Sequence, residues 1–351
     1  MQLCLAPMDG ITTYATRRIT QEIFEQYGKK SDSLQLWTEF MNVDGFLINP
    51  RKVIKHLLTD STQQPIAQIY GGNPDTLLEA AKIIQTNYGK VFSGIELNTG
   101  CPSTTVMKGG GGSDMMKNRE KTLQIIQTLS ETTKIGGLPF SIKARAGLNE
   151  EDKKKQADFL LEASKYCSKI SIHGRTLKQL YTWEADWNWI ASLRLQCHCP
   201  IIWNGGITSY NQAVKYQERY GLDGIMIGQA AIGNPWIFTP HIPNNEEKLN
   251  AIVRHLELTV ASDQYFEEII EPWEGEIWNK ILIPDGWLEK RIVYNNEHSD
   301  FFPHSLVEFR KFLFQYIKGI PDSREWKQKI LHVKGYGKIK REIFDFFKNI
   351  L

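Results

Sequence analysis

Short apolar runs recur along the first 240 residues, and each is followed by a break rich in Gly, Pro, Asn or Asp. Most successive runs are separated by a longer segment with helical spacing. This spacing is clearest over residues 74–87, 119–132 and 152–166, where Ala, Leu and Ile recur three and four positions apart. The pattern predicts strands that alternate with helices. The predicted strands span residues 3–7, 34–38, 65–70, 94–98, 140–143, 169–173, 200–204 and 224–228.

Alternation of strands with helices predicts a parallel sheet. Eight such units in about 230 residues match a (β/α)8 barrel, whose typical length is about 250 residues. The alternative is an open doubly wound sheet, which usually carries a Gly-x-Gly-x-x-Gly turn after its first strand. Residues 5–10 read Leu-Ala-Pro-Met-Asp-Gly instead. We therefore predict an α/β fold, a (β/α)8 TIM barrel followed by a smaller C-terminal helical domain.

The strand pattern stops after residue 240, so we predict a barrel domain over residues 1–240 and a helical domain over residues 241–351. In the second domain a helix is expected over residues 246–263, and residues 305–351 also have helical spacing. In this last part Lys and Arg clearly outnumber Asp and Glu, which makes it the basic part of the chain. The acidic, Trp-rich stretch 264–302 fits no regular pattern and stays unassigned.

The composition is that of an ordinary soluble globular protein, with 41% hydrophobic and 23% charged residues. The net charge is only +2, so a nucleic-acid surface would need local clusters of Lys and Arg. The five cysteines are odd in number and mostly scattered, which suits a reducing compartment. The N-terminus lacks the features of an export signal, and no apolar run approaches the roughly 20 residues of a membrane span. We expect a cytoplasmic protein.

Polar residues follow the predicted strands where each one ends. In a barrel of this kind the working residues lie at the C-terminal ends of the strands and in the loops just after them. The convergence of so many polar strand ends predicts one polar pocket. The residues at these ends include Pro7, Met8, Asp9, Gln68, Asn98, Lys143, Arg145, His173, Arg175, Asn204 and Gln229.

Glycines follow the last two predicted strands. Gly205, Gly206 and Gly228 would let main-chain N–H groups approach an anion, and the loops after strands seven and eight are the usual phosphate site of such barrels. The alternative is that they are ordinary turn glycines. Lys143 and His173 on the intervening strands favour a phosphorylated cofactor.

Two of these polar residues have alternative interpretations. Lys143 could form a Schiff base, as in barrel aldolases, or could face the electron-rich end of a flavin ring. His173 has no second ligand at metal-binding spacing. Residues 197–199, Cys-His-Cys, precede the seventh strand, but three crowded groups fall short of the four ligands of a typical zinc site. We expect no metal.

Cys101 is the most specific single residue. It follows a predicted buried strand within Asn-x-Gly-Cys-Pro, and a glycine run at residues 109–112 comes soon after it. A thiol with an ordinary pKa of about 8.5 is protonated at neutral pH and can act as a general acid. The glycine run would let the loop move over a bulky substrate. The alternative is a packed cysteine followed by a passive spacer.

Seven segments resemble signatures of the dihydrouridine synthase family, in that family's order. Each is weak alone, but together they span the whole predicted barrel. The tail segment 309–319 also resembles the family's C-terminal helical domain, which helps to bind tRNA. The seven segments are residues 5–10, 68–72, 98–102, 141–145, 173–176, 204–207 and 226–231.

The resemblance implies an FMN-dependent enzyme that uses NADPH to reduce the C5–C6 double bond of specific uridines in tRNA. Hydride would reach C6, Cys101 would protonate C5, and the base would have to leave the tRNA stack. Asn98, Arg145 and Arg175 would contact that base. We expect a monomer. The residues implied to bind FMN are Pro7, Met8, Asp9, Gln68, Lys143, His173, Asn204, Gly205, Gly206, Gly228 and Gln229.

The chain departs from the family pattern in two places. Gln229 stands where the family usually has Arg, so one charge-assisted phosphate contact is absent and we expect weaker FMN retention. The stretch 264–302 is longer than expected between barrel and tail. Three other functions remain open from the sequence. They are a small-molecule FMN reductase similar to dihydroorotate dehydrogenase or the ene-reductases, a lyase or aldolase that uses Lys143 as a Schiff base, and a catalytically silent RNA-binding protein.

Overall fold

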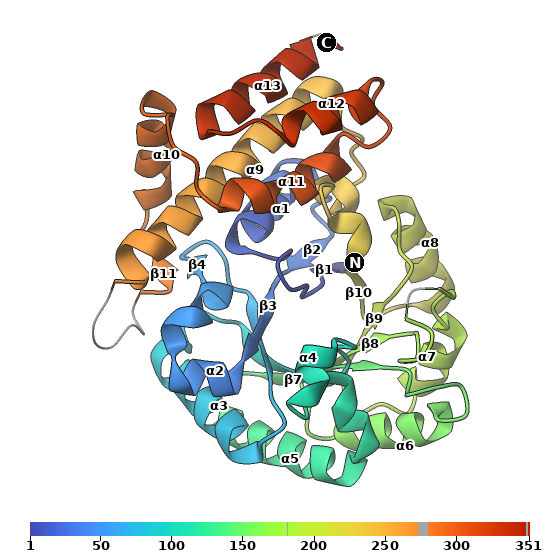
Figure 1. Cartoon of the computed structure of the whole chain (residues 1–351). Coiled ribbons are helices and arrows are strands. Elements are labelled where there is room, and N and C mark those ends of the chain that lie inside the picture. The colour runs from blue at the N-terminus through green and yellow to red at the C-terminus, as the bar shows by residue number, and fades with distance from the viewer. Residues whose placement is uncertain (181, 273–279, 349) are drawn as a thin grey trace.

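The fold is a parallel barrel in a computed structural model that describes residues 1–180, 182–272, 280–348 and 350–351. Within these ranges nine strands form one sheet in the order β2-β1-β10-β9-β8-β7-β6-β5-β3, with every neighbouring pair parallel. Its two edge strands, β2 and β3, are separated only by Leu36 in the chain, so the sheet curves round into a barrel (Figure 1). The strands are β1 Gln2–Leu5, β2 Ser33–Gln35, β3 Trp37–Asn42, β5 Ile66–Tyr70, β6 Gly94–Asn98, β7 Phe140–Arg145, β8 Lys169–His173, β9 Ile201–Asn204 and β10 Gly224–Ile227.

The predicted barrel is confirmed, but the prediction for its second strand was wrong in detail. A single strand was expected over residues 34–38, whereas the chain pairs with β1 up to Gln35 and then with β5 from Trp37 to Asn42. The register shifts between Trp37 and Phe40, which marks a bulge. Glu39 lies beyond the predicted strand but within β3, and its side chain is buried.

The helices of the barrel follow the spacing that the sequence predicted. Asn73 accepts a hydrogen bond from the Asp75 N–H and Pro74 occupies the first turn, so α3 begins at its predicted residue. The predicted helices at 119–132 and 152–166 correspond to α5 and α6. The helices of the barrel region are α1 Tyr14–Tyr27, α2 Val43–Ile48, α3 Pro74–Tyr88, α4 Thr104–Lys108, α5 Arg119–Ile135, α6 Lys153–Ala163, α7 Trp187–Arg194 and α8 Tyr210–Tyr220.

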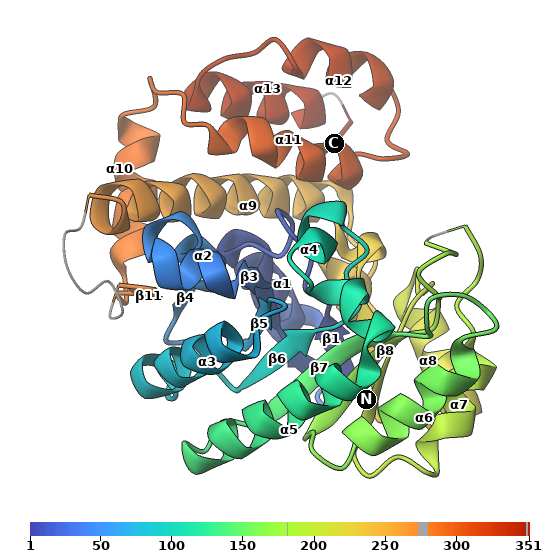
Figure 2. The same ribbon diagram turned by 60° about the horizontal axis from the view of Figure 1, so that its bottom comes forward.

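Beyond the barrel the chain is helical. A capping box between Asn244 and Glu247 starts α9, which packs against α1 on one side and against α10, α11 and α13 on others. Figure 2 shows α9 between the barrel and the layer of α11, α12 and α13. None of the described helices is long and apolar enough to cross a membrane. The helices are α9 Asn245–Tyr265, α10 Trp287–Glu297, α11 Ser305–Tyr316, α12 Ser323–Ile330 and α13 Tyr336–Lys348.

The stretch 264–302, which the sequence left unassigned, is partly regular. It contains a π-helical turn, Phe266–Ile270, the short strand β11, Leu282–Ile283, and α10; residues 273–279 lie outside the described ranges. β11 pairs in parallel with β4, Thr59–Asp60, in the barrel region. A part of the chain expected in the second domain therefore lies against the first. The division at residue 240 stays a prediction.

The interior of the barrel changes from apolar to polar along the strands. Cys4, Trp37, Ile66, Ile202 and Met226 belong to an apolar cluster inside it. Toward the C-terminal ends of the strands the fully buried residues become polar, and the strand-end residues above them line a cavity. The polarity of the barrel therefore rises toward the face where enzymes of this fold carry their active sites.

Candidate active site

One cavity of about 1350 Å³ collects the strand ends of the barrel. All of the site residues expected from the sequence line it except Gln68. Gln68 is fully buried and accepts a hydrogen bond from Asn98. The convergence predicted from the polar strand ends is therefore observed in space. The expected residues that line it are Pro7, Met8, Asp9, Asn98, Cys101, Lys143, Arg145, His173, Arg175, Asn204, Gly205, Gly206, Gly228 and Gln229.

One end of the cavity is built from glycine turns. Gly205 and Gly206 have φ values of +126° and +76°. A Cβ on Gly205 would lie 2.7 Å from Ala185 Cβ and 2.9 Å from His173 Cδ2, so only glycine fits. Within the described ranges the main-chain N–H groups of Gly205, Gly206 and Gly228 have no protein acceptor. Uncommitted N–H donors beside a cavity suit a phosphate group.

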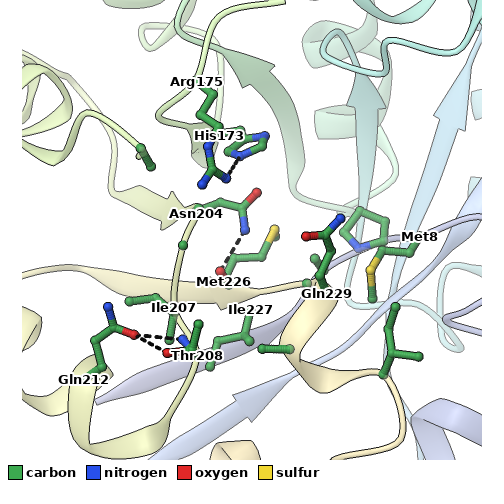
Figure 3. A pocket seen from close by; sticks show the side chains of 18 of the residues that line it. Met8, His173, Arg175, Asn204, Ile207, Thr208, Gln212, Met226, Ile227 and Gln229 are labelled. Carbon is green, nitrogen blue, oxygen red and sulfur yellow. Dashed lines mark hydrogen bonds between the residues drawn. The ribbon is translucent and has the colours of Figure 1, made fainter. Parts of the chain in front are cut away.

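Arg175 and His173 lie next to this glycine end. Figure 3 shows the two side chains joined by a hydrogen bond beside Asn204, and Arg175 Nη1 lies 3.2 Å from His173 Nε2. A guanidinium can only donate, so Nε2 accepts and Nδ1 carries the ring proton. Burial and the surrounding cations hold the pKa of His173 well below its ordinary value, so the ring is neutral. Arg175 Nη2 would lie 3.9 Å from a Cβ on Gly206, which places a positive charge beside the turn.

Lys143 projects from β7 into the same cavity. Its Nζ lies 3.4 Å from Asn204 Oδ1, and Asn204 Nδ2 donates to the Met226 carbonyl at 2.8 Å, which fixes the orientation of that amide. Burial lowers the pKa of Lys143 to about 8, against the attraction of the Glu96 carboxylate. Lys143 is therefore mostly protonated at neutral pH. A cation at this place can stabilise negative charge on the ring of a reduced flavin.

The Cys101 thiol lines the cavity with Lys143 and is held by its own loop. Asn98 Oδ1 accepts from the N–H groups of Gly100 at 3.1 Å and of Cys101 at 2.9 Å, while Arg145 Nε donates to the Gly100 carbonyl at 2.7 Å. Burial raises the pKa of the Cys101 thiol despite the nearby cations, so the thiol stays protonated at neutral pH. A protonated thiol fixed at the wall of a cavity can serve as a general acid.

The glycine run after Cys101 is packed closely against its neighbours. A Cβ on Gly72 would lie 2.3 Å from the Gly109 carbonyl oxygen, and a Cβ on Gly112 would lie 2.7 Å from the Cys101 carbonyl oxygen. The Ser113 N–H donates to that same Cys101 oxygen at 2.9 Å. The run therefore fixes the Cys101 loop by close backbone packing, which a passive spacer would not do.

The turn after β1 presents Met8 and Asp9 to the cavity. Gly10 has a φ of +62°, and its N–H donates to Glu39 Oε1 at 2.7 Å, which ties the turn to β3. Carboxylate oxygens of Asp9 and Glu39 and a ring nitrogen of His56 lie within 4.8 Å of one another. Glu39 therefore supports the wall of the cavity from within the barrel.

Two groups at this site were missed by sequence reasoning. Glu96 is fully buried in the middle of β6, and the signal was a carboxylate inside a run that otherwise reads as a buried strand. Lys248 of α9 and Gln315, Tyr316 and Lys318 from α11 and just beyond it also line the cavity. The tail was expected to bind tRNA but not to form part of the wall.

The barrel, its cavity and the glycine turns are those of a TIM-barrel enzyme with a site for a phosphorylated ligand. The model of the dihydrouridine synthase (Dus) family matches residues 4–283, and the chain belongs to this family. The resemblance found in the sequence is therefore confirmed.

Curated relatives carry names from the same family. The tRNA-dihydrouridine synthase B of Pseudomonas aeruginosa is 31% identical over 238 residues, 68% of each chain. A probable tRNA-dihydrouridine synthase of Staphylococcus aureus is 32% identical over 266 residues, 72% of this chain and 76% of that one. That of Rickettsia conorii is 26% identical across 99% of this chain and 94% of its own.

A solved structure shares the fold. Histamine dehydrogenase from Rhizobium sp. 4-9 matches with a TM-score of 0.52 and 11% identity, over 75% of this chain and 48% of that chain. At this identity the likeness shows the barrel fold alone.

Membership of the family establishes the reaction class. The chain is an oxidoreductase that uses an FMN-type flavin and forms dihydrouridine in tRNA. This result sets aside the three alternatives that the sequence left open. They are the small-molecule reductase, the Schiff-base lyase and the silent RNA-binding protein.

Proposed function

We propose that Cys101 is the general acid of a tRNA-dihydrouridine synthase that takes its electrons from NADPH. When bound and reduced by NADPH, FMN would supply a hydride for C6 of the uracil. The Cys101 thiol gives its proton to C5, so an S–H bond breaks and a C–H bond forms. The thiolate that remains lies near Lys143 and Arg145, whose charges favour it.

The residues present fit an FMN molecule. The uncommitted N–H groups of Gly205, Gly206 and Gly228 suit its phosphate. We assign Arg175 to this end as well as to the substrate, because its guanidinium lies beside the Gly206 turn. The neutral His173, the cationic Lys143 and the oriented amide of Asn204 would hold the ring system together with Pro7, Met8, Asp9 and Gln229.

The uracil would enter the cavity out of the tRNA stack. Asn98 and Arg145 are proposed contacts to the base, and both also hold the Cys101 loop. Lys248 and Lys318 stand at the mouth, where the tRNA backbone would pass. We further propose that the enzyme acts as a monomer in the cytoplasm, where its tRNA substrate is found and where the five free cysteines would stay reduced.

The observation that carries this proposal is that the Cys101 thiol lines the same cavity as Lys143 and His173, where burial raises its pKa. We expect Cys101→Ala to keep its flavin, because the glycine turns are untouched, and to lose dihydrouridine formation by about 10²–10⁴-fold. The measurement is single-turnover oxidation of the NADPH-reduced enzyme by tRNA, with dihydrouridine counted by mass spectrometry. Cys167→Ala, at a half-buried cysteine outside the cavity lining, is the matched control and should keep full activity. Normal turnover in Cys101→Ala would exclude the thiol as proton donor.

A further inference from the structure

A carboxylate lies at the centre of the barrel, below the cavity. Glu96 is fully buried in β6, where Gln68 Nε2 donates to its Oε1 at 2.6 Å and Ser171 Oγ donates to its Oε2 at 3.1 Å. Both oxygens accept, as those of an ionised carboxylate do. A buried charge is costly unless a charge of opposite sign lies near. Burial raises the pKa of Glu96, and Lys143 on the neighbouring strand β7 is the first of the groups that lower it and favour the carboxylate.

A chain of hydrogen bonds connects Glu96 to the Cys101 loop, and each donor and acceptor in it fixes the next. Because the carboxylate accepts from Gln68 Nε2, Gln68 presents Oε1 to Asn98, whose Nδ2 donates to it at 3.0 Å. Asn98 must then present Oδ1 to the loop, where it accepts from the Gly100 and Cys101 N–H groups. The acceptor oxygen of Glu96 therefore sets the orientation of both amides and of the loop that carries the thiol.

The same carboxylate acts on Lys143 through its charge. The titratable and charged groups around Lys143 are Glu96 and Cys101 from β6 and its loop, Arg145 from its own strand, and His173 from β8. Burial and Arg145 lower the pKa of Lys143, whereas Glu96 is the first of the groups that raise it. Without Glu96 the pKa would fall below about 8, so Lys143 would lose its proton at a lower pH.

We propose that Glu96 is a positioning residue of the reaction, the counter-ion of Lys143 and the anchor that orients the Cys101 loop through Gln68 and Asn98. The inference rests on the roles proposed above for Lys143 and Cys101. It gives a function to a buried carboxylate that is not among the residues lining the cavity.

The test compares Glu96→Gln with the wild type in the flavin-free full chain. Acetic anhydride acetylates only a neutral amine, so labelling of Lys143, read by peptide mass spectrometry across a pH series, reports its protonation. We expect the half-maximal labelling of Glu96→Gln at a pH about one unit lower. Glu96→Asp keeps the charge and should label as the wild type does. Ser171→Ala removes one hydrogen bond but no charge, so its curve should also stay in place.

The second measurement uses the holoenzyme. In the wild type we expect the rate at which tRNA oxidises the reduced flavin in a single turnover to fall at alkaline pH. In Glu96→Gln this fall should occur at a pH lower by the same amount as in the labelling experiment, while the FMN content stays normal. Superimposable labelling curves of Glu96→Gln and wild type would overturn the inference. A wild-type holoenzyme that forms no dihydrouridine would instead refute the proposed function, and the labelling result would still stand.

A stability comparison keeps the inference testable if Glu96→Gln alone does not fold. Lys143→Met leaves the buried carboxylate without its cation, so the double variant Glu96→Gln/Lys143→Met should unfold at a higher temperature than Lys143→Met. Thermal unfolding of the two variants decides this. Equal or lower stability of the double variant would show that the two charges are not partners.

Discussion

At the residue scale, we propose that Arg175 supplies positive charge to the glycine end of the cavity, where Gln229 is uncharged. Its guanidinium lies beside the Gly206 turn, and both residues line the cavity. We expect Arg175→Ala to raise the dissociation constant for FMN about tenfold or more, since a hydrogen bond to a charged group contributes about 1.5–3 kcal/mol. Gln229→Arg should tighten FMN binding and partly rescue Arg175→Ala. Flavin fluorescence on dilution of the holoenzyme measures the FMN affinity of each variant. An unchanged affinity of Arg175→Ala would refute the assignment of Arg175 to the phosphate.

The sequence predicted which residues meet in the cavity but not what each side chain contacts. Cys101, Lys143 and His173 could be placed together because strand ends of a parallel barrel share one face. The burial of Glu96 and its hydrogen bond to Gln68 depend on which face of each strand points inward, and a strand that is buried on both faces does not show this in its sequence. The position of Arg175 depends on a side-chain conformation that no spacing encodes.

At the element scale, the Cys101 loop depends on glycines that let two backbones touch. In Gly72→Ala the new Cβ would lie 2.3 Å from the Gly109 carbonyl oxygen, so the loop must move. We expect turnover to fall by about 10²-fold, the typical effect of a displacement of about 1 Å in a catalytic group. FMN content should stay normal. In the control Gly109→Ala the new Cβ would meet only the Val106 carbonyl oxygen, at 3.6 Å. The φ of residue 109 is −83°, a value that alanine adopts without strain. Equal rates for the two variants would contradict this account.

Elements with strong local signals were predictable, and elements set by long-range contacts were not. α3 and α9 begin where Asn caps them, so their starts could be inferred from the sequence to within one residue. The bulge in β3 arises from its pairing with β5, and the two-residue strand β11 exists only because β4 lies beside it. Neither pairing leaves a periodic pattern in the chain.

At the scale of the whole molecule, the C-terminal helices complete the mouth of the cavity. Tyr316 is buried and its hydroxyl lies 3.2 Å from Nδ1 of His255 in α9, while Phe309 and Phe312 pack around the same ring. Removing α11 would therefore expose apolar surface and open the wall of the cavity that Gln315 and Tyr316 line. Substitution of exposed residues is the cleaner way to separate tRNA binding from flavin chemistry.

Lys318 offers such a substitution. It is exposed just beyond α11 and lines the cavity that holds Cys101. With a net charge of only +2, the chain must bind tRNA through local cations of this kind. Lys318→Ala should weaken tRNA binding and lower the slope of log affinity against log salt by about 1, with FMN content and reduction by NADPH unchanged. Lys134→Ala, at the C-terminal end of α5 and thus at the opposite face of the barrel, is the control. Binding of tRNA at several salt concentrations measures both slopes, and a slope for Lys318→Ala equal to that of Lys134→Ala would mean that Lys318 contacts no phosphate.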